Sequence, residues 1–175
     1  MIKLNKKGFT HHLFLKKGEG FTLIELLVVI AIIALLSTIA VVSLGGARVK
    51  ARDAKRVADV KQMQTALEMY FNNNNSYLPL ASATITATNF NAVIKTPPLA
   101  PTPRDGTCSE TTENPYIYAA TEGTPAAACT TGLCHGYQIQ FCLGATTGGL
   151  SAGVHCATQD GIETGIGACS IAITP

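Results

Sequence analysis

The chain has 175 residues, enough for about one globular domain, and 47% of them are hydrophobic while 14% are charged. Its formal net charge is +2, but the first 20 residues alone hold five lysines against one glutamate. The remainder carries 8 basic and 10 acidic side chains, a net charge of −2. This balance argues against a nucleic-acid-binding surface, which requires a basic face.

The most informative segment is a long apolar run near the N-terminus. Between Leu23 and Leu44 there are 22 residues, of which four are not Ala, Val, Ile or Leu. A helix of roughly 20 apolar residues crosses a bilayer, so this segment can span one. Glu25 lies near its start, where an unpaired carboxylate costs about 3 kcal/mol. The acid therefore needs a partner, and it is the best clue to function.

The residues Gly20-Phe21-Thr22-Leu23-Ile24-Glu25, followed by the apolar run, resemble the N-terminal signature of type IV pilins and type II secretion pseudopilins. The resemblance implies that a membrane-embedded prepilin peptidase cuts after Gly20 and that Phe21 becomes N-methylated. It also implies that Glu25 pairs with the N-terminal amine of a neighbouring subunit and sets the register of assembly. A buried carboxylate and a buried ammonium are each costly alone and tolerable together.

An ordinary secretory signal peptide or a simple membrane anchor is the competing interpretation. A secretory signal has an apolar region of roughly 7–15 residues, followed by a cleavage site of small residues. A cut after Ala47 would fit that template weakly. However, the apolar run is too long, and Glu25 stands at its start.

The orientation in the membrane is decided by the cysteines. Five lysines precede the span and five basic residues follow it closely, so the positive-inside rule gives no answer. All six cysteines lie between Cys108 and Cys169, as expected of an exported and oxidised domain. We therefore expect a single-pass protein of the bacterial inner membrane, with its leader in the cytoplasm, that later joins an extracellular surface filament.

The helix is expected to continue through residues 47–71, which lack proline and are rich in helix-favouring residues. Side chains three or four apart form one apolar stripe that should pack under a head domain: Val57, Val60, Met63, Leu67, Tyr70 and Phe71. A polar face is expected opposite them: Arg52, Lys55, Arg56, Asp59 and Lys61. The adjacent Gly45 and Gly46 are the weak point, where we expect a bend or local melting.

Turn-forming residues 72–76 are expected to end this helix. Residues 66–79 again resemble major pseudopilins and related pilins, in the segment where the helix ends and the head begins. Residues 80–115, rich in Thr, Ala and Pro, should form the loop that varies within that family.

Strands are expected at 116–119, 136–143, around 152–157 and at 168–173, with a turn at 147–149. The predicted fold is α+β and pilin-like, with a long N-terminal helix packed on a small antiparallel sheet of three or four strands. The expected organisation is a leader (1–20), an apolar polymerisation helix (21–46), an amphipathic helix (47–71) and a disulfide-containing head (72–175).

Three disulfides are the simplest interpretation of the six cysteines, although sequence does not fix their connectivity. The candidates are Cys108, Cys129, Cys134, Cys142, Cys156 and Cys169. Cys129 and Cys134 are close enough for a local loop, and Cys142 could face Cys156 across a hairpin.

No metal and no cofactor are expected. A metal site is disfavoured, because paired C-x-x-C spacing is missing and an exported domain is oxidised. The residues considered for it are Cys129, Cys134, His135, Cys142, His155 and Cys156. Major pseudopilins often bind calcium in a C-terminal loop. Here Asp160 and Glu163 stand nearly alone, so that site is not carried over.

One enzyme motif occurs, since Gly149-Leu150-Ser151-Ala152-Gly153 matches the G-x-S-x-G nucleophile elbow of α/β-hydrolases. That fold needs an acid and then a histidine further along the chain. Here His155 comes first and Asp160 second. A glycine-rich hairpin turn explains the match better, and we expect no enzyme.

The sequence predicts a structural subunit of a type IV pilus-like filament that serves attachment, motility or DNA uptake. One alternative is a major-pseudopilin-like subunit of a type II secretion system. Another is a membrane-anchored binding domain that never polymerises, against which Glu25 argues. The expected partners are identical or related pilin subunits, prepilin peptidase, the inner-membrane assembly platform and, before assembly, the lipid bilayer.

Overall fold

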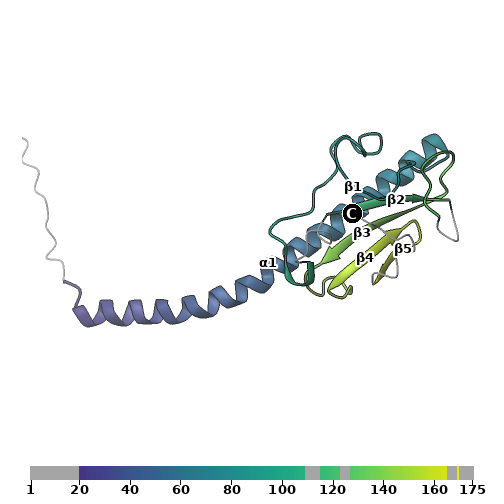
Figure 1. Cartoon of the computed structure of the whole chain (residues 1–175). Helices are drawn as coiled ribbons and strands as arrows, with labels where there is room; N and C mark the ends of the chain where they lie inside the picture. Colours follow the sequence, from purple (N-terminus) through teal and green to yellow (C-terminus); the bar gives the residue numbers. More distant parts are fainter. Residues whose placement is uncertain (1–19, 109–114, 123–126, 165–168, 170–175) are drawn as a thin grey trace, which may run out of the picture. The chain divides into compact units, whose positions relative to one another are not determined.

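The computed structural model describes residues 20–108, 115–122, 127–164 and 169 (Figure 1). The chain divides into two compact units, Met1–Val42 and Ser43–Pro175, and each is described by itself. Helix α1 (Leu23–Asn74) supplies the helical part of the first unit and then continues into the second.

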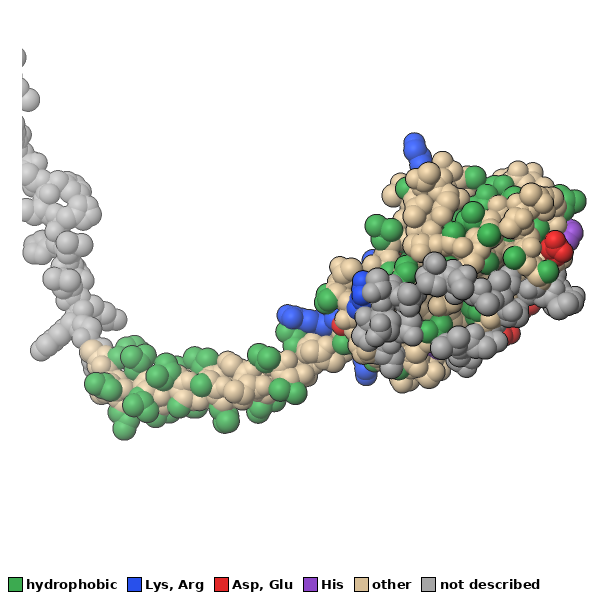
Figure 2. Space-filling model, in the orientation of Figure 1, with side chains coloured by type: hydrophobic (Ala, Val, Ile, Leu, Met, Phe, Trp, Pro, Cys, Tyr) green, Lys and Arg blue, Asp and Glu red, His purple; other side chains and the backbone are tan. Residues whose placement is uncertain are grey.

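The first unit presents an apolar helix with its side chains exposed. α1 contains an 18-residue window with a mean hydropathy of 3.0, long and apolar enough to cross a membrane, and none of that window is buried. Figure 2 shows these apolar side chains along the first part of the helix. A helix that is hydrophobic all round requires lipid or other apolar surfaces as its surroundings.

α1 continues through Gly45 and Gly46, so the local melting expected there is not observed. The helix ends at Asn74, three residues beyond the expected boundary but inside the run of asparagines. Asn75 follows with a φ of 53°, and its N–H donates to the carbonyl oxygen of Phe71 at 2.7 Å. A left-handed residue at this position is a common way to end a helix, and asparagine tolerates it.

The second unit contains a five-stranded antiparallel sheet in the order β1-β2-β3-β4-β5. The strands are β1 (Ala83–Thr84), β2 (Ile117–Thr121), β3 (Gly136–Leu143), β4 (Gly153–Thr158) and β5 (Gly161–Thr164). The three longest were predicted to within two residues, whereas β1 and β5 were not predicted. A short 3₁₀-helix, η1 (Gly106–Cys108), interrupts the long loop before β2. Of the strand expected at 168–173, all but Cys169 lies outside the described residues, and Cys169 forms a bend.

The part of α1 in the second unit packs across one face of the sheet (Figure 1). Alternate residues of β3 join this core, namely Tyr137, Ile139, Phe141 and Leu143. The helix contributes Val60, Met63 and Leu67, all fully buried, with Val57 and Phe71 partly buried beside them. Each such buried large side chain contributes about 1.5–3 kcal/mol. The predicted apolar stripe is therefore confirmed except at Tyr70, which is half-buried and does not join this core.

The predicted polar face is partly wrong. Arg56 and Asp59 are buried, and so is Asp53, which was not assigned to either face. These charged residues lie at and just before the start of the apolar stripe, where α1 meets loops of the head. The loops supply backbone and side-chain hydrogen-bond partners, which offset the desolvation cost of burying these charges.

Candidate assembly site and the helix–head junction

Thr22 and Glu25 close the N-terminal end of α1 with reciprocal hydrogen bonds. The backbone N–H and the hydroxyl of Thr22 donate to one carboxylate oxygen of Glu25, at 2.8 and 2.7 Å. The backbone N–H of Glu25 donates to the Thr22 hydroxyl oxygen at 3.3 Å. This arrangement is a capping box, in which both side chains satisfy helix-terminal donors. The Thr-x-x-Glu spacing is its sequence signal, which a reading of Glu25 alone overlooks.

Gly20 and Phe21 lie before the first turn of α1, outside the helix. Both are exposed, and the side chain of Phe21 is 87% exposed. Glu25 is exposed as well, at the start of the apolar helix surface. The three residues singled out by the sequence motif therefore lie close together at one end of the helix, and all three are exposed.

A buried ion pair anchors α1 to the head. Asp53 and Arg56 have fully buried side chains, and Nη1 of Arg56 lies 2.7 Å from Oδ1 of Asp53. The Asp53 carboxylate also accepts the backbone N–H groups of Gly144 at 2.9 Å and Ala145 at 2.8 Å. Nη2 of Arg56 donates to the carbonyl oxygen of Pro101 at 3.3 Å. These additional hydrogen bonds compensate the desolvation of both charges.

A second ion pair, between Arg52 and Asp105, lies beside the first. Here the start of η1 approaches the residue that follows β3 closely. A Cβ added at Gly106 would lie 2.1 Å from the carbonyl oxygen of Gly144, and Gly106 has a φ of 53°. Glycine is therefore required at this contact on both steric and conformational grounds.

Asp59 connects α1 to the start of β2. Its carboxylate accepts hydrogen bonds from Nζ of Lys55 at 2.6 Å and from the hydroxyl of Tyr116 at 2.9 Å. Burial raises the pKa of Tyr116 far above its ordinary value, and the negative charge of Asp59 raises it further. We call this set of polar contacts the helix–head junction: Arg52, Asp53, Lys55, Arg56, Asp59, Asp105, Tyr116 and Gly144.

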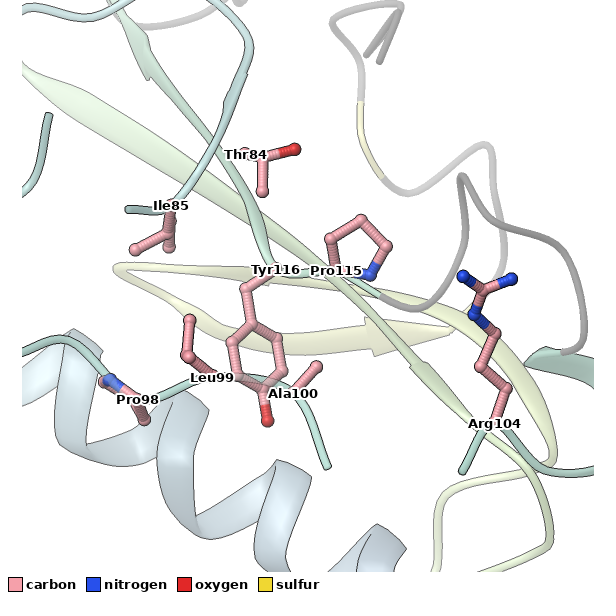
Figure 3. Close-up of a pocket in the computed structure, with 8 residues that line it drawn as sticks. All are labelled: Thr84, Ile85, Pro98, Leu99, Ala100, Arg104, Pro115 and Tyr116. Atoms are coloured by element: carbon pink, nitrogen blue, oxygen red, sulfur yellow. The ribbon is translucent and has the colours of Figure 1, made fainter. Parts of the chain in front are cut away.

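A pocket of about 240 Å³ lies between the proline-rich loop and the start of β2 (Figure 3). It is lined by Thr84, Ile85, Pro98, Leu99, Ala100, Arg104, Pro115 and Tyr116. This lining contains no carboxylate, thiol or imidazole, so it offers no metal ligand of the usual kinds. Within the described ranges, no group of three His, Cys, Asp or Glu side chains is placed to hold a metal ion.

The six cysteines form three disulfides in the structure: Cys108–Cys142, Cys129–Cys134 and Cys156–Cys169. The local bridge between Cys129 and Cys134 agrees with the expectation. The suggested pair of Cys142 and Cys156 is wrong, because the β3–β4 register places Cys142 opposite Val154. Cys142 instead bonds to Cys108 and ties η1 to β3.

The G-x-S-x-G motif falls in the connection between β3 and β4. Gly148 and Gly149 have φ values of 61° and 85°, and Thr147 and Leu150 exchange backbone hydrogen bonds around them. Two positive φ values in succession define a type I′ hairpin turn. Strand β4 follows, where a nucleophile elbow requires a helix, and Nε2 of His155 lies 2.8 Å from the carbonyl oxygen of Ser151. The hairpin interpretation is therefore confirmed.

Comparisons with known proteins agree with these features. Residues 15–41 match the family described as the prokaryotic N-terminal methylation motif. The chain is 33% identical over 102 residues to type II secretion system core protein G of Klebsiella michiganensis, covering 56% of this chain and 68% of that protein. It is 36% identical over 89 residues to core protein G of Aeromonas hydrophila, covering 51% and 58%. It is also 42% identical over 72 residues to the type IV wide pilus major component PilA4 of Thermus thermophilus, covering 41% and 55%.

An exposed apolar helix that continues into a small antiparallel head, with a Gly-Phe-Thr-Leu-Ile-Glu motif at its start, defines a pilin-like class of protein. The chain belongs to the type IV pilin and type II secretion pseudopilin family. It spans little more than half the length of the first curated relatives that it matches. No solved structure gives a significant match.

Proposed function

We propose that this chain is a structural subunit of a type IV pilus-like filament, cleaved after Gly20 and assembled through its apolar helix. The observation that carries the proposal is the exposure of the whole apolar surface between Leu23 and Leu44, which precedes a folded head in the chain. Such a surface suits a bilayer before assembly and a shared core of packed helices afterwards. The role is structural, and we assign no catalysis to it.

Glu25 is the residue that we propose to direct assembly. Cleavage after Gly20 would create an ammonium group at Phe21, adjacent to Thr22. In the capping box, Thr22 holds the Glu25 carboxylate at the same end of the helix. In the filament, this carboxylate would pair with the N-terminal amine of a neighbouring subunit, because both charges are costly to bury alone.

The partners follow from this proposal. Prepilin peptidase would cut the exposed segment before α1, and an assembly platform of the inner membrane would receive the membrane-stored subunit. Identical or related pilin subunits would then surround its apolar helix. The chain would thus pass from a single-pass inner-membrane protein to an extracellular filament, where attachment, motility and DNA uptake are the functions to test.

A second candidate is a major-pseudopilin-like subunit of a type II secretion system. The similarity to core protein G over 102 residues favours it. Abundant filaments that can be sheared from the cell surface would support the pilus. A secretion defect on deletion of this chain, without visible surface filaments, would support the pseudopilin.

Substitution of Glu25→Ala tests the proposal. We expect the variant to be processed and stored in the membrane but not assembled, because the amine of the neighbouring subunit loses its partner. The measurement is immunoblotting of sheared filaments and of the membrane fraction, with Glu163→Ala as a matched loss of an exposed carboxylate on the head. Normal filaments from Glu25→Ala would contradict the assembly role.

A further inference from the structure

The five basic residues that follow the apolar segment within residues 48–56 fall into two groups. Three of them are paired with acids: Arg52 with Asp105, Lys55 with Asp59, and Arg56 with Asp53. The other two, Arg48 and Lys50, are exposed, and their side chains form no ion pair or hydrogen bond with the described residues. Uncompensated positive charge on this part of α1 therefore belongs to Arg48 and Lys50.

Both side chains lie at the depth of lipid headgroups if the apolar segment fills the hydrocarbon layer. At about 1.5 Å per residue, Arg48 lies about 6 Å beyond Leu44 along the helix axis and Lys50 about 9 Å beyond it. The headgroup layer is about 5–7 Å thick on each side of the hydrocarbon. Cα–Cβ bonds in a helix tilt toward its N-terminus, so both side chains lean back toward the apolar segment. Their long aliphatic stems also let the charge reach the layer from slightly outside it.

We propose that Arg48 and Lys50 bind anionic phospholipid headgroups on the side of the membrane that carries the head domain. This inference rests on the proposed membrane-stored state of the subunit. Each cation at an anionic surface strengthens the attraction about fivefold at moderate salt. The two contacts fix the depth of the helix in the bilayer, and assembly into a filament must break them.

A lipid-quenching experiment tests this contact. The chain contains no tryptophan, so Ala47→Trp places a single indole next to the two cations. This full-length protein is reconstituted into phosphatidylcholine vesicles that contain, as a minor lipid, either brominated phosphatidylglycerol or brominated phosphatidylcholine. We expect quenching by the brominated phosphatidylglycerol to be at least about fivefold stronger, and to fall toward parity at about 1 M salt, where screening is short-ranged.

Two double variants in the same background separate the cations from net charge. Arg48→Gln/Lys50→Gln is expected to abolish the preference for the anionic lipid. Lys61→Gln/Lys95→Gln removes the same charge from exposed positions of the helix and head, and it is expected to retain the preference.

Equal quenching by the two brominated lipids in the Ala47→Trp protein would overturn the proposal. An unchanged preference in Arg48→Gln/Lys50→Gln would overturn it too. If that variant also failed to form filaments, the result would indicate that the two cations instead contact acidic side chains on the head of a neighbouring subunit. A failure of the proposed function looks different. In that case Glu25→Ala would assemble normally while the lipid preference remained.

Discussion

At the scale of single residues, two carboxylates on the same helix have opposite environments. Glu25 is exposed and bonded to Thr22 within its own first turn, so its partner can be exchanged at little cost. Asp53 is fully buried and bonded to Arg56 and to two backbone N–H groups of the head. Glu25, being exposed, is available for contacts with another subunit. Asp53, being buried, stabilises the fold of its own subunit.

Substitution of Asp53→Ala is expected to destabilise the head strongly. It leaves the Arg56 guanidinium buried without its carboxylate, and breaking a buried pair in this way costs about 3–5 kcal/mol. Thermal unfolding followed by circular dichroism measures the effect, with exposed Glu163→Ala as a control expected to change stability by less than about 0.5 kcal/mol. Equal melting temperatures for the two variants would show that the buried pair does not stabilise the fold.

The buried tyrosines predict a loss of stability at high pH. Burial raises the pKa of Tyr116, Tyr118 and Tyr137 well above the unfolded value of about 10. Below about pH 10 both states are protonated, so the stability is fully present. Above it the unfolded state releases its protons first, and each tyrosine costs about 1.4 kcal/mol per pH unit. Melting temperatures measured between about pH 8 and pH 11 should fall only above about pH 10, and a constant value throughout would contradict this.

At the scale of secondary-structure elements, the sequence predicts structure where residues repeat with a regular spacing. It does not predict contacts between segments that are distant in the chain. The stripe of Val60, Met63 and Leu67 follows from local helical spacing, and β3 follows from its alternation. β1 has two residues and β5 four, too few to show a period. The burial of Asp53 depends on backbone groups of Gly144 and Ala145, more than 90 residues away, which no local pattern encodes.

The cysteines show the same division. Cys129 and Cys134, five residues apart, were paired correctly from their closeness. Cys142 was not, because its partner depends on the β3–β4 register and on the position of η1. Both are set by the tertiary structure.

The close contact between η1 and the end of β3 predicts that Gly106→Ala is destabilising. The new Cβ would meet the Gly144 carbonyl oxygen, a backbone atom that cannot move aside cheaply. Gly148→Ala is the matched control, because Gly148 has a similar φ of 61° but open space around it. Chemical denaturation should show Gly106→Ala to be less stable than the control by about 1–3 kcal/mol. Equal stabilities would mean that the loop yields and that the contact does not hold it.

At the scale of the whole molecule, the two units divide the work of a filament subunit. The described part of the first unit is an apolar helix with exposed side chains, and the second unit is a folded head with three disulfides. Charge changes sign within the second unit, because residues 48–61 hold six basic side chains against two acidic ones, while the chain beyond Lys61 holds two against seven. The exposed apolar helix therefore suits a membrane or a core of packed helices, while the head is a separately folded, disulfide-bonded unit.

Mass spectrometry of material sheared from cells tests the central claim most directly, through the intact mass and the N-terminal peptide. We predict a chain that begins at N-methylated Phe21 and has the mass of a protein with all six cysteines oxidised. A chain that still carries residues 1–20, or one that begins near Arg48, would contradict the account and indicate an anchored or secreted protein instead.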